Sequence, residues 1–153
     1  MSRPSPQQLA STGSEDGHQT ALFSEIANLV NSGQLPREAN LAYAIPNGGA
    51  RGDSERSNKI RGAKLKATGV KKGVPDIKLP VARRGYFGLY IEMKRPKSER
   101  GQAGRVSEEQ EEWHVALREQ GYCVLTCIGY EPALNVLKNY LAGEKTKIVK
   151  DGA

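Results

Sequence analysis

Two acidic residues and one lysine stand at a spacing that could form a metal-dependent hydrolytic site. Asp76 begins one alternating apolar segment, and Glu92 and Lys94 lie two residues apart in the next. Carboxylate oxygens suit Mg²⁺ or Mn²⁺, and the main-chain carbonyl of Met93 could complete the coordination sphere. A cation held there can polarise a phosphodiester oxygen and lower the pKa of a bound water. The lysine could orient or deprotonate that water, or stabilise negative charge on the reacting phosphate.

A β-hairpin would bring these residues together. The segment GVPDIKLPVARRGYFGLYIEMKR, residues 73–95, alternates apolar and polar side chains on both sides of Arg83-Arg84-Gly85, which we expect to form the turn. A hairpin centred on Arg84 has these cross-strand pairs: Ile77 with Ile91, Leu79 with Leu89, Val81 with Phe87, Lys78 with Tyr90, and Asp76 with Glu92. A slip of one residue would pair apolar with polar side chains throughout, so the register is well defined. Lys94 projects from the same side of its strand as Glu92.

An ion-pair cluster on a half-solvated sheet is the alternative interpretation of Asp76, Glu92 and Lys94. A P-D followed by E-x-K is a short pattern that also arises by chance. Two observations favour the catalytic interpretation. Both halves of the pattern lie on well-patterned strands in matching register, and basic segments flank them on both sides.

The positive charge of the chain is concentrated near these strands. The formal net charge is +6, and residues 51–72 alone carry eight basic residues against two acidic ones. A second basic group runs from Arg83 to Arg105. Such concentration is typical of proteins that bind a polyanion, and nucleic acid is the default partner.

The remaining pattern predicts one α/β domain, a mixed β-sheet with helices on both faces. We expect a helix from about Ser14 to Gly33, strands at 41–45, 76–81, 87–94 and 122–128, a short basic helix at 54–68, a helix opened by the capping box Ser107–Gln110 with Trp113 and Leu117 facing inward, and a last helix with Pro132 in its first turn.

The ends of the chain and its cysteines complete the prediction. Residues 1–13, rich in Ser, Pro and Gln, are expected to be a disordered arm before a domain at 14–143 and a tail at 144–153. No apolar run is long enough for a signal sequence or a membrane span, so we expect an intracellular protein. Cys123 and Cys127 would lie roughly 13 Å apart on one strand, too far for a disulfide.

The motifs resemble a known family. P-D followed by E-x-K resembles the PD-(D/E)xK nuclease superfamily, and the wider context resembles its VRR-NUC branch. The similarity covers nearly the whole chain after the first residues. It includes SEDGHQ, IPNGG with the following Arg51, KLKATGVKKGVPDIKLP, GYFGLYIEMKRP, SEEQEEWHVALREQGYCVLTCIGY, and a final helix ending in NYL.

The resemblance implies a restriction-endonuclease-like fold with an α-β-β-β-α-β core, and cleavage of DNA that depends on Mg²⁺ or Mn²⁺. It implies metal-binding roles for Asp76 and Glu92 and a catalytic role for Lys94. Glu15 matches an additional acidic position on the first helix, although a favourable interaction with the helix dipole would explain it nearly as well. Gln110 matches a helix glutamine that reaches the site, and the capping box explains it about equally well.

The resemblance also suggests how nucleic acid is bound. Asn47 to Gly49 and Arg51 match a loop near the site that could contact phosphate, although the glycines could serve only the turn. The residues expected to contact nucleic acid are Asn47, Gly48, Arg51, Lys59, Lys64, Lys71 and Lys72. Small stand-alone family members are typical of bacteriophages and are associated with dimers and with branched DNA, including four-way junctions. The implied location is the cytoplasm of a bacterial or phage-infected host cell.

Other functions remain open from the sequence. A non-catalytic DNA-binding module would keep the fold and the basic face but would have no reason to keep paired carboxylates, and charge does not separate DNA from RNA, so a ribonuclease is also possible. His18 and His114 lie on predicted helices without partners at ligand spacing, which favours solvated or core-edge histidines over metal ligands. Trp113 is interpreted as a core residue before a base-stacking one.

Overall fold

The computed structural model describes residues 3–47, 54–97 and 103–148. These residues form a sheet in the order β1-β2-β3-β4, with β1 at Tyr43–Ala44, β2 at Ile77–Leu79, β3 at Leu89–Lys94 and β4 at Cys123–Ile128. The first three strands are antiparallel neighbours, and β3 pairs with β4 in parallel. The sheet is therefore mixed, as predicted.

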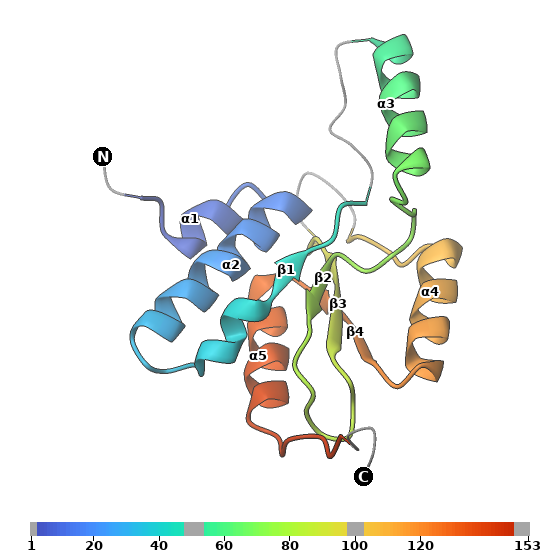
Figure 1. Ribbon diagram of the computed structural model, residues 1–153. Helices are drawn as coiled ribbons and strands as arrows, with labels where there is room; N and C mark the ends of the chain where they lie inside the picture. Colours follow the sequence, from blue (N-terminus) through green and yellow to red (C-terminus); the bar gives the residue numbers. More distant parts are fainter. Residues whose placement is uncertain (1–2, 48–53, 98–102, 149–153) are drawn as a thin grey trace.

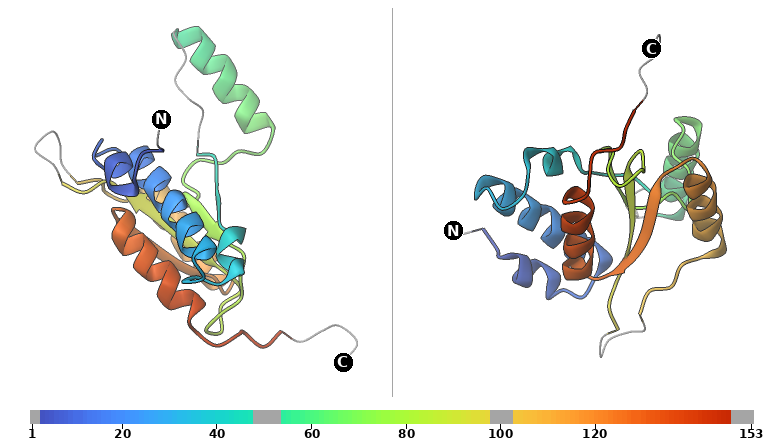
Figure 2. Two further views of the ribbon diagram at one scale, coloured as in Figure 1. Left: turned by 90° about the vertical axis from the view of Figure 1, so that its left-hand side faces the viewer. Right: turned by 90° about the horizontal axis from the view of Figure 1, so that it is seen from below.

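Helices cover both faces of this sheet (Figure 1 and Figure 2). They are α1 (Pro6–Ala10), α2 (Glu15–Asn31), the 3-10 helix η1 (Arg37–Leu41), α3 (Glu55–Ala67), α4 (Glu108–Glu119) and α5 (Tyr130–Leu141). Helices α2 and α5 lie on one face and α4 on the other, whereas α3 projects away from the body. Leu22 of α2, Ile91 of β3 and Leu137 of α5 belong to one buried cluster. The predicted α/β fold class is confirmed.

The register of the hairpin is the one that the apolar pattern predicts. Ile77 pairs with Ile91, and Leu79 pairs with Leu89, and all four side chains are buried. Because one face of both strands packs into the core, a one-residue slip would turn these side chains out to water. The register is what places Asp76, which directly precedes β2, beside the second half of β3.

The turn of the hairpin is offset from this register by one position. Arg83 forms a bridge with Tyr86, and the two residues between them, Arg84 and Gly85, have φ of 55° and 83°. Positive φ at both central residues defines the two-residue turn that fits the twist of antiparallel strands. The guanidinium of Arg84 donates to the carbonyl of Asn139 at 2.8 and 3.1 Å, which helps to hold a non-glycine residue in this conformation.

The offset makes the predicted pair of Val81 with Phe87 wrong. Val81 is buried, but Phe87 is 55% exposed, and its N–H donates to the carbonyl of Gly121 at 3.0 Å. The strands are consequently shorter than expected, β2 ending at Leu79 and β3 beginning at Leu89.

Helix α4 begins at the predicted capping box. The Ser107 hydroxyl accepts from the Gln110 N–H, and the Gln110 side chain accepts from the Ser107 N–H. The expectation that Trp113 and Leu117 point inward needs correction, because both are only half-buried. The residue of α4 that is buried against the sheet is His114, at 1% exposure.

The expected disordered arm is wrong for part of its length. Residues 6–10 form α1, which has its own capping box between Ser5 and Gln8. Pro6 is buried, and Leu9 packs against the core. Gly17 of α2 permits this close approach, since a Cβ there would come within 2.7 Å of the Leu9 carbonyl oxygen.

Two smaller differences concern β1 and the C-terminal segment. Leu41, expected at the start of a strand, ends the 3-10 helix η1. In the predicted tail, the Thr146 hydroxyl donates to the Tyr86 carbonyl at 2.7 Å, and the carbonyl of Glu144 accepts from the Arg84 N–H at 2.9 Å. Residues 144–146 therefore lie against the hairpin turn.

The cysteines are both free thiols, as predicted; Cys127 is buried and Cys123 half-buried. Burial raises the pKa of the Cys127 thiol to about 11, so it remains protonated at neutral pH. None of the helices in the described part of the chain combines the length and the hydrophobicity that a membrane span requires.

Candidate active site

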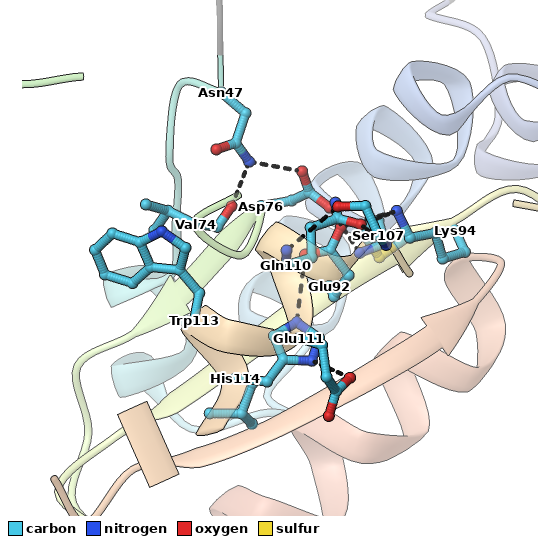
Figure 3. A network of polar contacts seen from close by, with 12 residues as sticks. Asn47, Val74, Asp76, Glu92, Lys94, Ser107, Gln110, Glu111, Trp113 and His114 are labelled. Atoms are coloured by element: carbon cyan, nitrogen blue, oxygen red, sulfur yellow. Dashed lines mark hydrogen bonds and ion pairs between the residues drawn. The ribbon is translucent and has the colours of Figure 1, made fainter. Parts of the chain in front are cut away.

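The structure brings Asp76, Glu92 and Lys94 together at one end of the β2–β3 hairpin (Figure 3). The Lys94 ammonium lies 3.1 Å from Glu92 Oε1. Asp76 Oδ2 accepts the main-chain N–H of Met93 at 2.7 Å, so the Asp76 carboxylate is held against the backbone between the other two residues. The N–H and C=O groups of one strand residue point to the same edge, so the Met93 carbonyl also lies on the Asp76 side.

Gln110 of α4 is the side chain that ties this group to the opposite layer. Its Oε1 accepts from the Ser107 N–H at 2.9 Å and from Lys94 Nζ at 3.0 Å, and its Nε2 donates to Glu92 Oε1 at 2.6 Å. Sequence reasoning treated the capping role and the site role of Gln110 as alternatives. In the structure the Gln110 side chain forms the capping box and also contacts Lys94 and Glu92.

Asn47 holds Asp76 from the other side. Its Nδ2 donates to the Val74 carbonyl at 2.6 Å and to Asp76 Oδ1 at 3.1 Å. Its Oδ1 is buried and has no hydrogen-bond partner among the described residues. Asn47 was expected to contact nucleic acid, and its observed partners place it directly beside the carboxylate.

His114 is the residue of this cluster that sequence reasoning missed. Its ring is 1% exposed, and its Nε2 lies 3.5 Å from Glu92 Oε2. Burial lowers the pKa of His114, an effect that the nearby carboxylate of Glu111 partly opposes. A single histidine carries no spacing signal. The one available hint was its position on α4 one turn after Gln110, which places both side chains on the same face of the helix.

Glu92 is an unusual carboxyl group in its surroundings. Burial, and then the negative charge of Asp76, raise the pKa of Glu92 to about 8, against the opposing effect of the Lys94 ammonium. Its Oε2 is buried and makes no hydrogen bond within the described residues. A buried oxygen left in this state costs free energy unless a proton or a cation compensates it.

Glu15 approaches the site from the first turn of α2. A Cβ added to Gly104 would lie 2.9 Å from Glu15 Oε1 and 3.2 Å from Lys94 Cδ. The Glu15 carboxylate and the Lys94 side chain therefore flank the same small space, which stays open because residue 104 has no side chain. His18, on the same helix, lies elsewhere; its Nδ1 accepts the Tyr130 N–H at 3.2 Å.

The described residues supply some of the ligands that a hard divalent cation needs. In residues 3–47, 54–97 and 103–148, no three side chains of the His, Cys, Asp and Glu types converge as a ready metal site. Two carboxylates adjoin, however, and Glu92 Oε2 and Asn47 Oδ1 are both buried without a hydrogen bond among the described residues. Mg²⁺ is commonly held by one or two carboxylates, with water and substrate oxygens as the other ligands, and this set satisfies that requirement.

The basic residues expected to contact nucleic acid lie on the side of Asn47 and α3. Lys59 and Lys64 are exposed on α3, where Lys59 pairs with Glu55 at 3.3 Å. Lys71 and Lys72 follow that helix, and Lys72 pairs with Glu109 at 2.9 Å. The expectations for Gly48 and Arg51 fall outside the described residues.

The mixed sheet and the helices on both of its faces form one α/β domain. The family model described as the VRR-NUC domain matches residues 19–130. This is well over half of the chain, which therefore belongs to the VRR-NUC domain family and has its nuclease-type fold.

A solved structure titled "VRR_NUC domain protein" is similar over 87% of this chain and 92% of that chain, with a TM-score of 0.64 and 24% sequence identity. At this identity the likeness shows the fold alone. A search of curated proteins found no match.

The raised pKa of Glu92 predicts how stability depends on pH in the absence of metal. The folded protein keeps this proton up to about pH 8, whereas the unfolded chain loses it near pH 4.5. The contribution of Glu92 is therefore fully present below pH 4.5 and is lost as the pH rises to 8, by up to about 1.4 kcal/mol per pH unit. Urea unfolding in EDTA should show a steeper loss of stability between pH 5 and pH 8 for the wild type than for Glu92→Gln.

The control for this measurement is Glu119→Gln, since Glu119 is an exposed carboxylate on the same helix as Gln110. It should follow the wild-type profile. Parallel profiles for the wild type and Glu92→Gln would show that Glu92 titrates normally.

Proposed function

We propose that this protein is a divalent-metal-dependent endonuclease that hydrolyses DNA phosphodiester bonds. The observation that carries the proposal is the arrangement around Glu92. One of its oxygens is held by Lys94 and Gln110, and the other is buried, makes no hydrogen bond among the described residues and lies 3.5 Å from His114 Nε2, while a second carboxylate, Asp76, adjoins Glu92. A purely structural ion pair would have no use for the second carboxylate, which opposes the charge of the first.

The metal ligands in this proposal are the carboxylates of Asp76 and Glu92 and the main-chain carbonyl of Met93, with Glu15 as an additional acidic group at the edge of the site. When bound, Mg²⁺ or Mn²⁺ supplies Lewis-acid polarisation of the phosphodiester and lowers the pKa of a water molecule. Asn47 and the Met93 N–H fix the two oxygens of Asp76, so this carboxylate is pre-oriented before any ligand binds.

Lys94 is the proposed catalytic residue that acts on water and phosphate. An ammonium group has three donors, and two of them are used by Glu92 Oε1 and Gln110 Oε1. The third is available to orient the attacking water or to stabilise charge on the phosphate. Gln110 is a positioning residue, because it holds Lys94 and Glu92 through hydrogen bonds.

The open side of the site is at Asp76 and Asn47, which are both partly exposed, whereas Glu92 and Lys94 are buried. The lysines of α3 and of the segment that follows lie on this side. They give the approach a positive potential, which attracts the phosphate backbone without regard to sequence. We place this activity in the cytoplasm of a bacterial or phage-infected host cell, where the DNA substrate is found.

Removal of Asp76 or Lys94 should abolish cleavage but spare binding. We expect Asp76→Ala and Lys94→Ala to lose at least about 10²-fold in cleavage rate, while DNA affinity changes little. Duplex, single-stranded and junction DNA, with matched RNA, would be incubated with Mg²⁺, Mn²⁺ or EDTA.

The matched controls are Glu119→Ala and Lys147→Ala, which remove exposed side chains of the same charges. Full cleavage by Asp76→Ala would refute the assignment of the site. Binding without cleavage by the wild type would favour a DNA-binding module, and cleavage of RNA alone would favour a ribonuclease.

We further propose branched DNA, such as a four-way junction, as the preferred substrate, and a homodimer as the active form. One such site cuts one strand, so paired cuts across a symmetric junction require two sites related by a twofold axis. Sedimentation at micromolar concentration, with and without junction DNA, should give the mass of a dimer. A monomeric mass under both conditions would overturn the proposed assembly and leave the chemistry of the site untouched.

A further inference from the structure

A groove of about 880 Å³ lies between the C-terminal half of α3 and helix α4. Its lining combines an aromatic ring, apolar side chains and lysines, and it includes Leu65, Val70 and Trp113. This volume falls in the range of sites that take small organic groups. The groove lies outside the cluster of Asp76, Glu92 and Lys94, but Asn47, which donates to Asp76, lines it as well.

Two glycines keep one wall of the groove open. A Cβ added to Gly62 or to Gly69 would meet no atom within 4 Å. Helix α3, which carries Gly62, has no buried residue and projects from the body (Figure 1). Helix α3 therefore forms one side of the groove, and its side chains do not fill the space.

Trp113 is held in place at the other wall. Its indole N–H donates to the Lys72 carbonyl at 3.1 Å. A Cβ added to Gly73 would lie 3.0 Å from Trp113 Cδ1 and 2.9 Å from the Glu109 carbonyl oxygen, so the chain before β2 packs tightly on the edge of the ring. The ring is thereby fixed, and it remains only half-buried beside the groove.

The charge of the groove suits a phosphate backbone. Lys66, Lys71 and Lys72 line it and are exposed. Lys72 pairs with Glu109, whereas Lys66 and Lys71 have no ion-pair partner within the described part of the chain. Two uncompensated ammonium groups beside a fixed aromatic ring are the combination found where proteins bind single-stranded nucleic acid.

We infer that this groove is a binding site for an unpaired nucleotide of the DNA substrate, with its base against Trp113 and its phosphates at Lys66 and Lys71. A base inside a duplex has both faces covered by its neighbours, so only an unpaired base can present a face to an aromatic side chain. Asn47 links the groove to Asp76, so a strand seated there continues toward the candidate active site. This inference rests on the proposed function and narrows its substrate to branched DNA that offers an unpaired nucleotide at the branch point, next to the cut.

The sole tryptophan of the chain makes the inference directly measurable. A thymidine oligonucleotide of roughly eight residues should quench Trp113 fluorescence in EDTA, where no cleavage occurs. An abasic oligomer of equal length should bind about 5- to 150-fold more weakly, the range expected when base stacking on an aromatic ring is lost. Equal affinity for both oligomers would overturn the inference, because it would leave only non-specific attraction to the lysines.

A blocking variant tests the location. Gly62→Leu places a side chain in the open space of the groove and replaces glycine by a better helix former, so it should fold with unchanged or higher Tm. It should bind the thymidine oligomer at least about 10-fold more weakly, whereas Gly62→Ala should bind it normally. Wild-type affinity in Gly62→Leu would place the binding elsewhere and overturn the inference.

Two lysine variants test the contribution of positive charge to binding. Lys71→Ala should lower the slope of log affinity against log salt concentration by about 0.7, the value for one phosphate contact with a single strand. Lys147→Ala removes an exposed lysine in the segment after α5 and should leave the slope unchanged. Equal slopes for the wild type and Lys71→Ala would show that Lys71 does not contact a phosphate of the bound strand.

The test of nucleotide binding in the groove can be decided independently of the proposed nuclease activity. Asp76→Ala should bind the thymidine oligomer as the wild type does. If the protein cleaves duplex and junction DNA but binds base-containing and abasic single strands with equal affinity, the proposed groove site is refuted and the proposed nuclease activity stands. Binding in the groove without cleavage of any substrate would refute the nuclease alone.

Discussion

A carboxylate that is removed from water needs a positive charge, a proton or hydrogen-bond donors to offset its lost hydration. The groups that do this for Glu92 determine how the domain is arranged around its site. Glu92 is 1% exposed and lies beside a second carboxylate. Lys94 and Gln110 hold one of its oxygens, and the other faces His114 at 3.5 Å. These partners come from β3 and α4, so the two layers are connected through one buried acid. Burial and the charge of Asp76 raise the pKa of Glu92 to about 8, so the site favours a bound proton, which a divalent cation would displace.

The hairpin makes this arrangement possible, and its register could be predicted from the sequence. Apolar residues alternate on both strands, so only one register buries Ile77 against Ile91 and places Asp76 on the side of Glu92. The capping box of α4 was predictable for a similar reason, since Ser107 and Gln110 form a local motif that needs no tertiary contact. Features that depend on neighbouring residues or on a regular apolar period could therefore be predicted from the sequence.

Features that depend on tertiary packing were not accessible from one sequence. His114 is buried against Glu92 because α4 crosses the sheet at that point, and no local pattern specifies this crossing. The pairing of Val81 with Phe87 failed because the turn prefers two residues of positive φ, which shifts the register by one position near the end of the hairpin. Trp113 was interpreted as a core residue, yet the groove beside it follows from the projection of α3 away from the body.

The central claim is that Asp76 and Glu92 jointly hold one hard divalent cation, and calorimetric titration of the metal-free protein with Mn²⁺ tests it most directly. The wild type should bind Mn²⁺ with release of protons at pH 7, and Asp76→Asn and Glu92→Gln should each bind at least about 10-fold more weakly, with Glu119→Gln unchanged. Undiminished Mn²⁺ affinity in both site variants would contradict the account.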